Sequence, residues 1–166
     1  ALTQHLDSFK DNLYEEMKGK LPETDYTVPV PRGEEYLYYS RTMEGKSYSI
    51  HCRAPIQNGS NQQQLDWDGS KEMPILEDEE VYLDTNALAE GKDYCSTGNV
   101  RMSPSHTKVA YTLDTVGGET YKMFVKDVAT SEILYENPVL DIDSTVVWGN
   151  DDNTIYYLKM DDAHRP

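Results

Sequence analysis

The sequence predicts a mainly β protein in which four-stranded antiparallel units repeat after one amphipathic N-terminal helix. Three observations predict this class. Apolar residues recur at helical spacing only near the start, segments rich in β-branched and aromatic residues dominate the remainder, and these segments repeat at a constant offset. The chain has 13 Tyr and only 2 Phe, which suits strands whose rings are buried while the hydroxyls reach polar groups.

Residues 2–21 have the pattern of a helix with one apolar face. The apolar positions follow each other at steps of three or four residues, which places them on one stripe: Leu2, Leu6, Phe9, Leu13, Met17 and Leu21. A dimeric coiled coil is the alternative, but Pro22 ends the pattern before enough heptads accumulate. We therefore expect the stripe to pack against the chain's own domain or against a part of the protein outside this chain.

After Asp25 the pattern changes to extended segments. Pro29 and Pro31 hold residues 27–31 extended, because a proline excludes its predecessor from the helical region. Later segments predicted as strands are separated by Gly, Asp, Asn, Pro and Ser: residues 36–42, 47–53, 81–84, 108–113, 120–128, 133–135, 145–148 and 154–160. In the central unit we expect four strands, at residues 99–103, 108–113, 120–128 and 132–136.

The predicted strands repeat along the chain. Four positions have an apolar counterpart 46 residues later: Val100, Met102, Val109 and Tyr111 are matched by Val146, Trp148, Ile155 and Tyr157. Leu37 and Tyr39 precede Val109 and Tyr111 by 72 residues, and the excess of 26 equals the length of a polar stretch at 54–79. A period in the forties with four short strands per unit is typical of a β-propeller blade.

These repeats predict how the chain is organised. We expect a helical segment at 1–24, a first blade at 25–98 with a long insertion at 54–79, a second blade at 99–144, and the start of a third at 145–166. A propeller needs at least four blades to close. About two and a half blades therefore form a partial β-propeller, and we interpret the sequence as an excerpt of a longer chain.

The charge of the chain excludes several classes of partner. Fifteen Lys and Arg against 30 Asp and Glu leave a net charge of −15, so we expect no nucleic acid and no membrane as partner. No apolar segment approaches the roughly 20 residues of a membrane-spanning helix, and residues 1–5 lack the features of a signal peptide. Cys52 and Cys95 are too few for a disulfide scaffold, which favours a cytosolic location with buried thiols.

The sequence lacks a catalytic or metal-binding signature. No serine lies in a Gly-x-Ser-x-Gly string, and the four histidines fall in separate segments. His51 and Cys52 are neighbours on a predicted strand, so their side chains point to opposite faces and cannot hold one ion. The acidic run at 77–80 is interpreted as a solvated loop, with a docking surface for basic peptides as the alternative. We expect no catalytic residue, metal or cofactor in this chain.

A set of short strings carries a family resemblance: Tyr36-Leu37-Tyr38-Tyr39-Ser40-Arg41-Thr42, Glu44-Gly45-Lys46, residues 48–53, residues 80–86, Leu88-Ala89-Glu90-Gly91, Met102-Ser103-Pro104-Ser105, Val146-Val147-Trp148 and residues 161–166. In combination they resemble the prolyl oligopeptidase family of serine peptidases. The Ala-Glu-Gly and Glu-Gly-Lys-x-Tyr strings favour the oligopeptidase B group over the proline-specific branch. The likeness extends from the helix to the last residue.

The resemblance implies an enzyme larger than this chain. In that family an α/β-hydrolase domain with a Ser-Asp-His triad is capped by a seven-bladed propeller, which admits only short peptides, and the oligopeptidase B group cleaves after Lys or Arg. The triad belongs to the hydrolase domain, so no catalytic residue is assigned here. The implied partners are that domain and short basic peptides, whose local concentration an acidic propeller would raise.

The resemblance also implies charged contacts that close the propeller over the hydrolase domain. The positions that match them, called the candidate latch residues from here on, are Asp25, Glu119, Thr120 and Asp143. An ordinary role as solvated turn residues is the alternative. A non-catalytic propeller that binds other proteins also stays open, because propellers host many functions.

Overall fold

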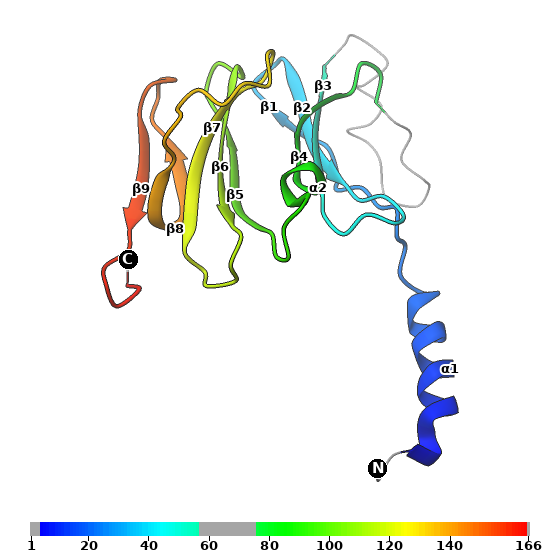
Figure 1. Cartoon of the computed structure of the whole chain (residues 1–166). Coiled ribbons are helices and arrows are strands. Elements are labelled where there is room, and N and C mark those ends of the chain that lie inside the picture. Colours follow the sequence, from blue (N-terminus) through cyan, green and yellow to red (C-terminus); the bar gives the residue numbers. More distant parts are fainter. Residues whose placement is uncertain (1–3, 57–75, 166) are drawn as a thin grey trace.

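Two antiparallel sheets stand side by side, and one helix projects away from them (Figure 1). This arrangement is seen in a computed structural model, which describes residues 4–56 and 76–165. A 3₁₀ turn, Gln4–Leu6, leads into helix α1, Asp7–Lys18. The predicted mainly β class, a partial propeller preceded by a helix, is confirmed.

The strands follow each other in space in the order of the sequence. The first sheet contains β1 to β4: Val30–Arg32, Tyr36–Arg41, Ile50–Pro55 and Glu80–Asp84. The short helix α2, Thr85–Ala89, then leads to the second sheet, with β5 to β9: Ser96–Met102, Lys108–Asp114, Tyr121–Asp127, Val139–Trp148 and Ile155–Lys159. Residues 56–79 of the predicted insertion at 54–79 connect β3 to β4, whereas Ala54 and Pro55 belong to β3, and residues 57–75 lie outside the described part of the chain.

The sequence repeat reappears in the pairing of the strands. Two antiparallel pairs recur 46 residues apart: Val100–Tyr111 and Met102–Val109 recur as Val146–Tyr157 and Trp148–Ile155. Two more recur 72 residues apart: Leu37–Ala54 and Tyr39–Cys52 recur as Val109–Lys126 and Tyr111–Phe124. Since the hydrogen-bond register repeats together with the apolar residues, the units are structural repeats.

The fourth strand of the second sheet differs from the prediction. Residues 133–135 form no strand, and Ile133 makes an isolated bridge with Lys126. This short segment stays exposed, with 59% of Tyr135 accessible, so it buries little apolar surface. The sheet is continued by β8, which pairs with β7 through Ile142 and with β9 through its second half. The predicted blade boundary at 144/145 falls inside β8, and the division into blades stays a prediction.

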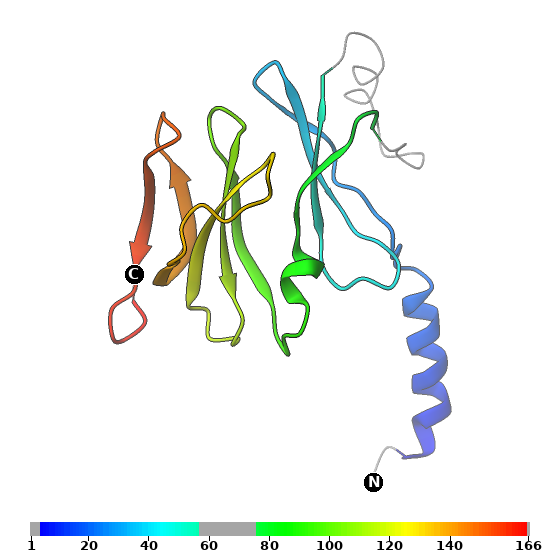
Figure 2. The same cartoon turned by 45° about the horizontal axis from the view of Figure 1, so that its top comes forward.

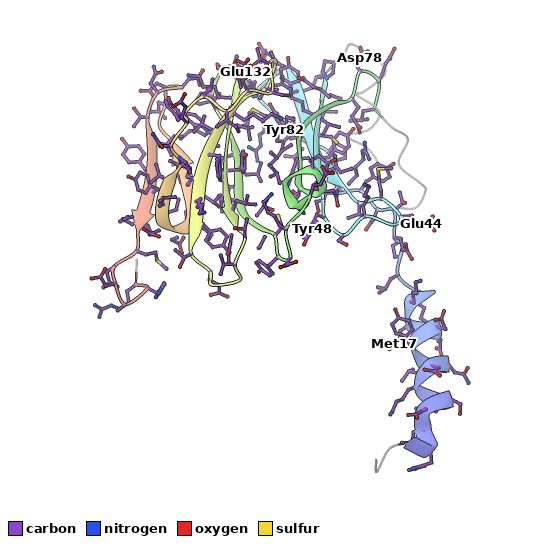
Figure 3. All side chains as sticks on the ribbon, in the orientation of Figure 1. Met17, Glu44, Tyr48, Asp78, Tyr82 and Glu132 are labelled. Carbon is purple, nitrogen blue, oxygen red and sulfur yellow. The ribbon has the colours of Figure 1, made fainter. Side chains whose placement is uncertain are left out.

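The core gathers on the two faces of each sheet. Successive side chains of a strand point to opposite faces, so Leu37 packs within the first sheet while Tyr38 faces the second. Tyr38 shares the space between the sheets with Tyr82, which Figure 3 labels, and with Val109. A hydrogen bond of 2.7 Å between the Tyr38 hydroxyl and Nδ1 of His106 adds a polar link across this space. The sheets therefore pack face to face through a mixed aromatic and apolar layer.

Helix α1 does not pack on the sheets. Its apolar stripe is open to solvent, with Phe9 63% and Met17 60% exposed, and none of its residues is buried. Figure 2 shows the helix directed away from both sheets in a second view. Packing against the chain's own domain, one of the two expectations, is therefore wrong for the described residues. An isolated helix of this length is marginal in water, and packing against a part of the protein outside this chain, the other expectation, stays a prediction.

Candidate interdomain edge

Three candidate latch residues lie at one end of the second sheet. Thr120 directly precedes Tyr121 and Asp143 directly follows Ile142, and these two neighbours form a cross-strand pair of β7 and β8. Thr120 and Asp143 are therefore at the same end of this pair. Glu119 precedes Thr120 in the turn between β6 and β7, at that same end.

Asp25 lies at the matching end of the first sheet. Its backbone N–H donates to Oγ1 of Thr42 (3.1 Å), and its carbonyl accepts from the Thr42 N–H (2.9 Å). Thr42 directly follows β2, as the turn residues 115–120 follow the equivalent strand β6. Both sheet ends lie on the side from which α1 projects (Figure 1). We call this side, with the four candidate latch residues, the helix-side edge.

The turn before Glu119 is built around Asp114, a residue that the sequence analysis did not identify. Its carboxylate is 2% exposed and accepts the backbone N–H groups of Val116 (2.8 Å), Gly117 (2.9 Å) and Glu119 (2.9 Å). Burial by itself raises the pKa of Asp114, but these donors outweigh it and hold the pKa below its usual range. The Asp-x-x-Gly-Gly string is the sequence signal for such a turn. The backbone of Glu119 is thus held in place while its side chain stays exposed.

Thr120 already has a partner in this chain. Its hydroxyl lies 3.1 Å from Nδ1 of His164 in the loop that follows β9. That loop is held by Asp161, whose carboxylate accepts from the Arg165 guanidinium at 2.7 Å and from the Ala163 N–H at 2.8 Å. The helix-side edge therefore also carries an imidazole and a guanidinium.

The three carboxylates among the candidate latch residues have no cationic partner within the described part of the chain. Asp143 accepts the Thr145 N–H at 2.8 Å and the Ser144 hydroxyl at 3.4 Å. The bond from the Thr145 backbone is the main cause that lowers the pKa of Asp143, which therefore stays ionised at neutral pH. An exposed or half-buried carboxylate without a cation can receive an Arg, Lys or His from another domain.

The acidic run at 77–80 is not solvated throughout, which corrects our interpretation. Glu79 is 11% exposed and accepts from the Arg41 guanidinium at 2.9 Å and from the Tyr39 hydroxyl. Glu80 pairs with the buried Arg53 at 2.8 Å. These partners precede their carboxylates by 38 and 27 residues, so only the folded sheet brings them together.

The described residues contain no metal site and no activated thiol. No group of three or more His, Cys, Asp or Glu among them could hold a metal ion. Cys52 and Cys95 are buried free thiols, and burial raises the pKa of Cys52 to about 12. Since the thiolate is the reactive form, Cys52 is inert at neutral pH. Within the same residues, no helix combines the length and the apolar character needed to span a bilayer.

Comparison with known proteins covers the whole chain. Residues 1–166 match the family model described as the prolyl oligopeptidase N-terminal β-propeller domain. The chain is 30% identical over 161 residues to dipeptidyl aminopeptidase BI of Pseudoxanthomonas mexicana, covering 97% of this chain and 22% of that protein. It is 31% identical over 159 residues to protease 2 of Moraxella lacunata, covering 94% of this chain and 21% of that protein. The chain thus spans about one fifth of the length of these relatives.

Solved structures agree with this match. The chain superposes on oligopeptidase B from Trypanosoma brucei, a closed form with covalently bound antipain, with a TM-score of 0.75 and 31% identity. The alignment covers 98% of this chain and 20% of that one. A structure from a study of two prolyl endopeptidases shares the fold, with a TM-score of 0.59 and 20% identity over 93% of this chain and 22% of that chain.

Proposed function

The chain belongs to the prolyl oligopeptidase N-terminal β-propeller family, and from this premise we propose that it is the propeller portion of an oligopeptidase B-type serine peptidase. The similarity to the oligopeptidase B structure along 98% of the chain supports the type. In this proposal a cytosolic full-length protein cleaves short peptides after Lys or Arg, and its catalytic triad lies in a hydrolase domain outside residues 1–166. The blades are those expected from the repeats, at 25–98, 99–144 and 145–166.

The helix-side edge is the observation that carries the proposal. Helix α1 exposes Phe9, Leu13 and Met17, and it projects from the side on which β6 ends and β7 begins (Figure 1). Glu119 and Asp143 belong to that end of the second sheet. An exposed apolar stripe and carboxylates without cationic partners among the described residues, on one side of the molecule, together give the composition of an interface, with a hydrophobic part and charged groups. In the proposed enzyme this edge faces the hydrolase domain.

The candidate latch residues then have a defined role in the proposal. A guanidinium or imidazole of the hydrolase domain that meets Asp25, Glu119 or Asp143 forms a charge-assisted pair, worth about 1–3 kcal/mol when closure excludes water. Thr120 acts differently, because its hydroxyl is joined to His164. Breaking a pair shifts the full-length enzyme toward its open form while the triad stays intact.

The catalytic part of the proposal is tested with the full-length protein and a short arginyl peptide substrate. We expect hydrolysis after Arg and its loss with a serine-directed acylating inhibitor, because the proposed nucleophile is a serine. Turnover that survives the inhibitor contradicts a serine peptidase. A full-length protein without turnover favours the non-catalytic propeller instead.

The latch role is tested with Asp143→Asn and Glu119→Gln in the same protein at low salt. Each is expected to lower kcat/KM by about fivefold to 150-fold, which corresponds to the loss of about 1–3 kcal/mol from one charge-assisted contact, with little change in Tm. Glu132→Gln is the matched control, because Glu132 is an exposed carboxylate at the opposite end of the sheets (Figure 3). Unchanged kinetics in both edge variants leaves these residues as ordinary surface.

A further inference from the structure

A cleft of about 550 Å³ separates the first strands of the two sheets. One wall comes from β1 and the residues before it, including Val28 and Arg32, and the other from residues 97–101 of β5. Its floor includes Tyr38, and Tyr82 of β4 also lines it, the residue that Figure 3 labels between the sheets. The volume is within the range of small-molecule and peptide sites.

Two arginines line this cleft, and neither has an acidic partner among the residues that the structure describes. The chain has five arginines, and three of them pair with carboxylates: Arg41 with Glu79, Arg53 with Glu80 and Arg165 with Asp161. The other two, Arg32 and Arg101, both line the cleft, and neither has a carboxylate within ion-pair distance in the described part of the chain. Acidic residues outnumber basic ones twofold, 30 to 15, so two arginines without carboxylates beside one cleft are a distinctive feature.

The arginines lie toward the same end of the cleft. Arg32 is the last residue of β1, and Arg101 is the next to last of β5. The turns that follow these strands meet, because the His106 ring after β5 lies 5.5 Å from the ring of Tyr36 at the start of β2. The Arg32 guanidinium carbon lies 5.3 Å from the centre of the Tyr38 ring. A guanidinium held over a ring keeps its N–H edge available for a planar carboxylate.

A bulge in β5 brings an amide to the same cleft. The register of β5 shifts between Thr97 and Val100, and a Cβ at Gly98 would lie 2.5 Å from Cβ of Ser144, so only glycine fits there. Asn99 follows, with its N–H bonded to Oγ1 of Thr112 at 2.8 Å. Its side-chain Oδ1 is buried and has no hydrogen-bond donor in the described structure. The bulge therefore places the backbone of residues 97–101 along the wall of the cleft.

We propose that this cleft binds the carboxylate of a short peptide. Arg32 and Arg101 receive the carboxylate, and the wall beside Val28 and Tyr82 contacts the rest of the peptide. The carboxylate can be the peptide's C-terminus or an acidic side chain, since both offer the same planar anion. Binding here does not require that the peptide be cleaved.

The test is calorimetric titration of the full-length protein with four N-acetylated tripeptides. Ac-Ala-Ala-Glu and Ac-Ala-Ala-Gln are each used with a free C-terminal carboxylate and with a carboxamide. None contains Lys or Arg, so none is a substrate in the proposed function. Binding about tenfold tighter for the peptides with a free terminus identifies the C-terminal carboxylate, and the same preference for Glu over Gln identifies the side chain. Equal affinity for all four peptides overturns the proposal.

Variants locate the site. Arg32→Gln and Arg101→Gln are each expected to weaken binding of the preferred peptide about tenfold, and Arg32→Lys to keep part of it, because Lys retains the charge but not the fork. Lys122→Gln removes the same charge from an exposed position of β7 outside the cleft and is expected to leave affinity unchanged. Unfolding temperatures confirm that each variant is folded. Equal losses of affinity in the Arg and Lys122 variants overturn the site.

The two proposals fail in different ways. Peptide binding without any hydrolysis supports this inference and rejects the proposed function. Hydrolysis without peptide binding supports the proposed function and rejects this inference.

Discussion

The ion pair between Arg41 and Glu79 joins the end of β2 to the residue before β4, and its removal is expected to destabilise the first sheet. The Arg41 guanidinium donates to Oε1 of Glu79 from Nε at 3.1 Å and from Nη2 at 2.9 Å. The two side chains are only 17% and 11% exposed, and Tyr39 donates its hydroxyl to the same carboxylate. Removing one partner leaves a buried charge without compensation.

The magnitude follows from this burial. Loss of one partner of a fully buried pair costs about 3–5 kcal/mol, and Tyr39 retains one hydrogen bond to Glu79, so Arg41→Met is expected to cost about 3 kcal/mol. Glu79→Gln keeps an acceptor but loses the charge, and about 2 kcal/mol is expected. The double variant Arg41→Met/Glu79→Leu removes both charges, so its cost is expected to be smaller than the sum of the single changes.

The assay is urea unfolding of the full-length protein, together with amide hydrogen exchange in β2, β3 and β4. The exposed pair Lys20–Glu16, with side chains 70% and 63% accessible, provides the control, and Lys20→Met is expected to change little. Strictly additive costs in the double variant, or a cost below about 1 kcal/mol for Arg41→Met, would refute the reasoning.

The same pair predicts a pH dependence. Burial alone raises the pKa of Glu79, but the hydrogen bonds from Arg41 and Tyr39 outweigh it and lower the pKa below the ordinary value of 4.5. The contribution of Glu79 to stability is therefore complete above that ordinary value and is lost as the pH falls through the lower folded-state pKa. Arg41→Met is expected to remove this loss, so the stability gap between variant and parent narrows in acid.

Three further predictions concern other parts of the chain. Gly98→Ala is expected to lower the free energy of unfolding by about 2 kcal/mol or more, because the added Cβ would lie only 2.5 Å from Cβ of Ser144. An unchanged Tm in calorimetry would contradict this close packing. Asp114→Asn is expected to lower the free energy of unfolding by about 1–2 kcal/mol at neutral pH and by less in acid, because the pKa of Asp114 is lowered and protonation of its carboxylate removes its stabilising effect. A difference in stability between variant and parent that does not change with pH in urea unfolding would contradict this. If another part of the full-length protein covers α1, Phe9→Ser is expected to lower the free energy of unfolding by about 1.5–3 kcal/mol. Val116→Ser, in an exposed turn, is expected to lower it by less than about 0.5 kcal/mol, and equal losses in the two variants would show that α1 stays solvated.

Local pattern determined the strands and their repetition. The alternation that buries Leu37 and Tyr39 on one face of β2 recurs at Val109 and Tyr111 of β6, and so does their pairing. These features were predictable because side-chain direction alternates with each strand residue and strand neighbours in a meander are neighbours in sequence. The prediction failed where pattern was weak, at residues 133–135, where three apolar residues did not form a strand.

Part of the helix-side edge was predictable from the sequence and part was not. Turn positions between strands placed Glu119 and Thr120 at a sheet end from sequence alone. The hydrogen bonds from the turn backbone to Asp114 were not predicted. The two glycines after Asp114 are a turn signal, but the sequence does not show that the Asp114 carboxylate is buried. The hydrogen bond between Thr120 and His164 could not be predicted, because the two residues are 44 positions apart in the sequence and only the fold brings them together.

The sequence by itself determined the fold class, the repeat and the approximate strand limits, since these depend on interactions between residues close along the chain. Only the tertiary structure decided which charged side chains lie close together. In it, Glu79 pairs with Arg41 and Glu80 pairs with Arg53. Arg32 and Arg101 both line one cleft. The physical reason is that ion pairing and burial depend on the distance between side chains in space. That distance is set by how the sheets twist and pack against each other, which no local pattern records.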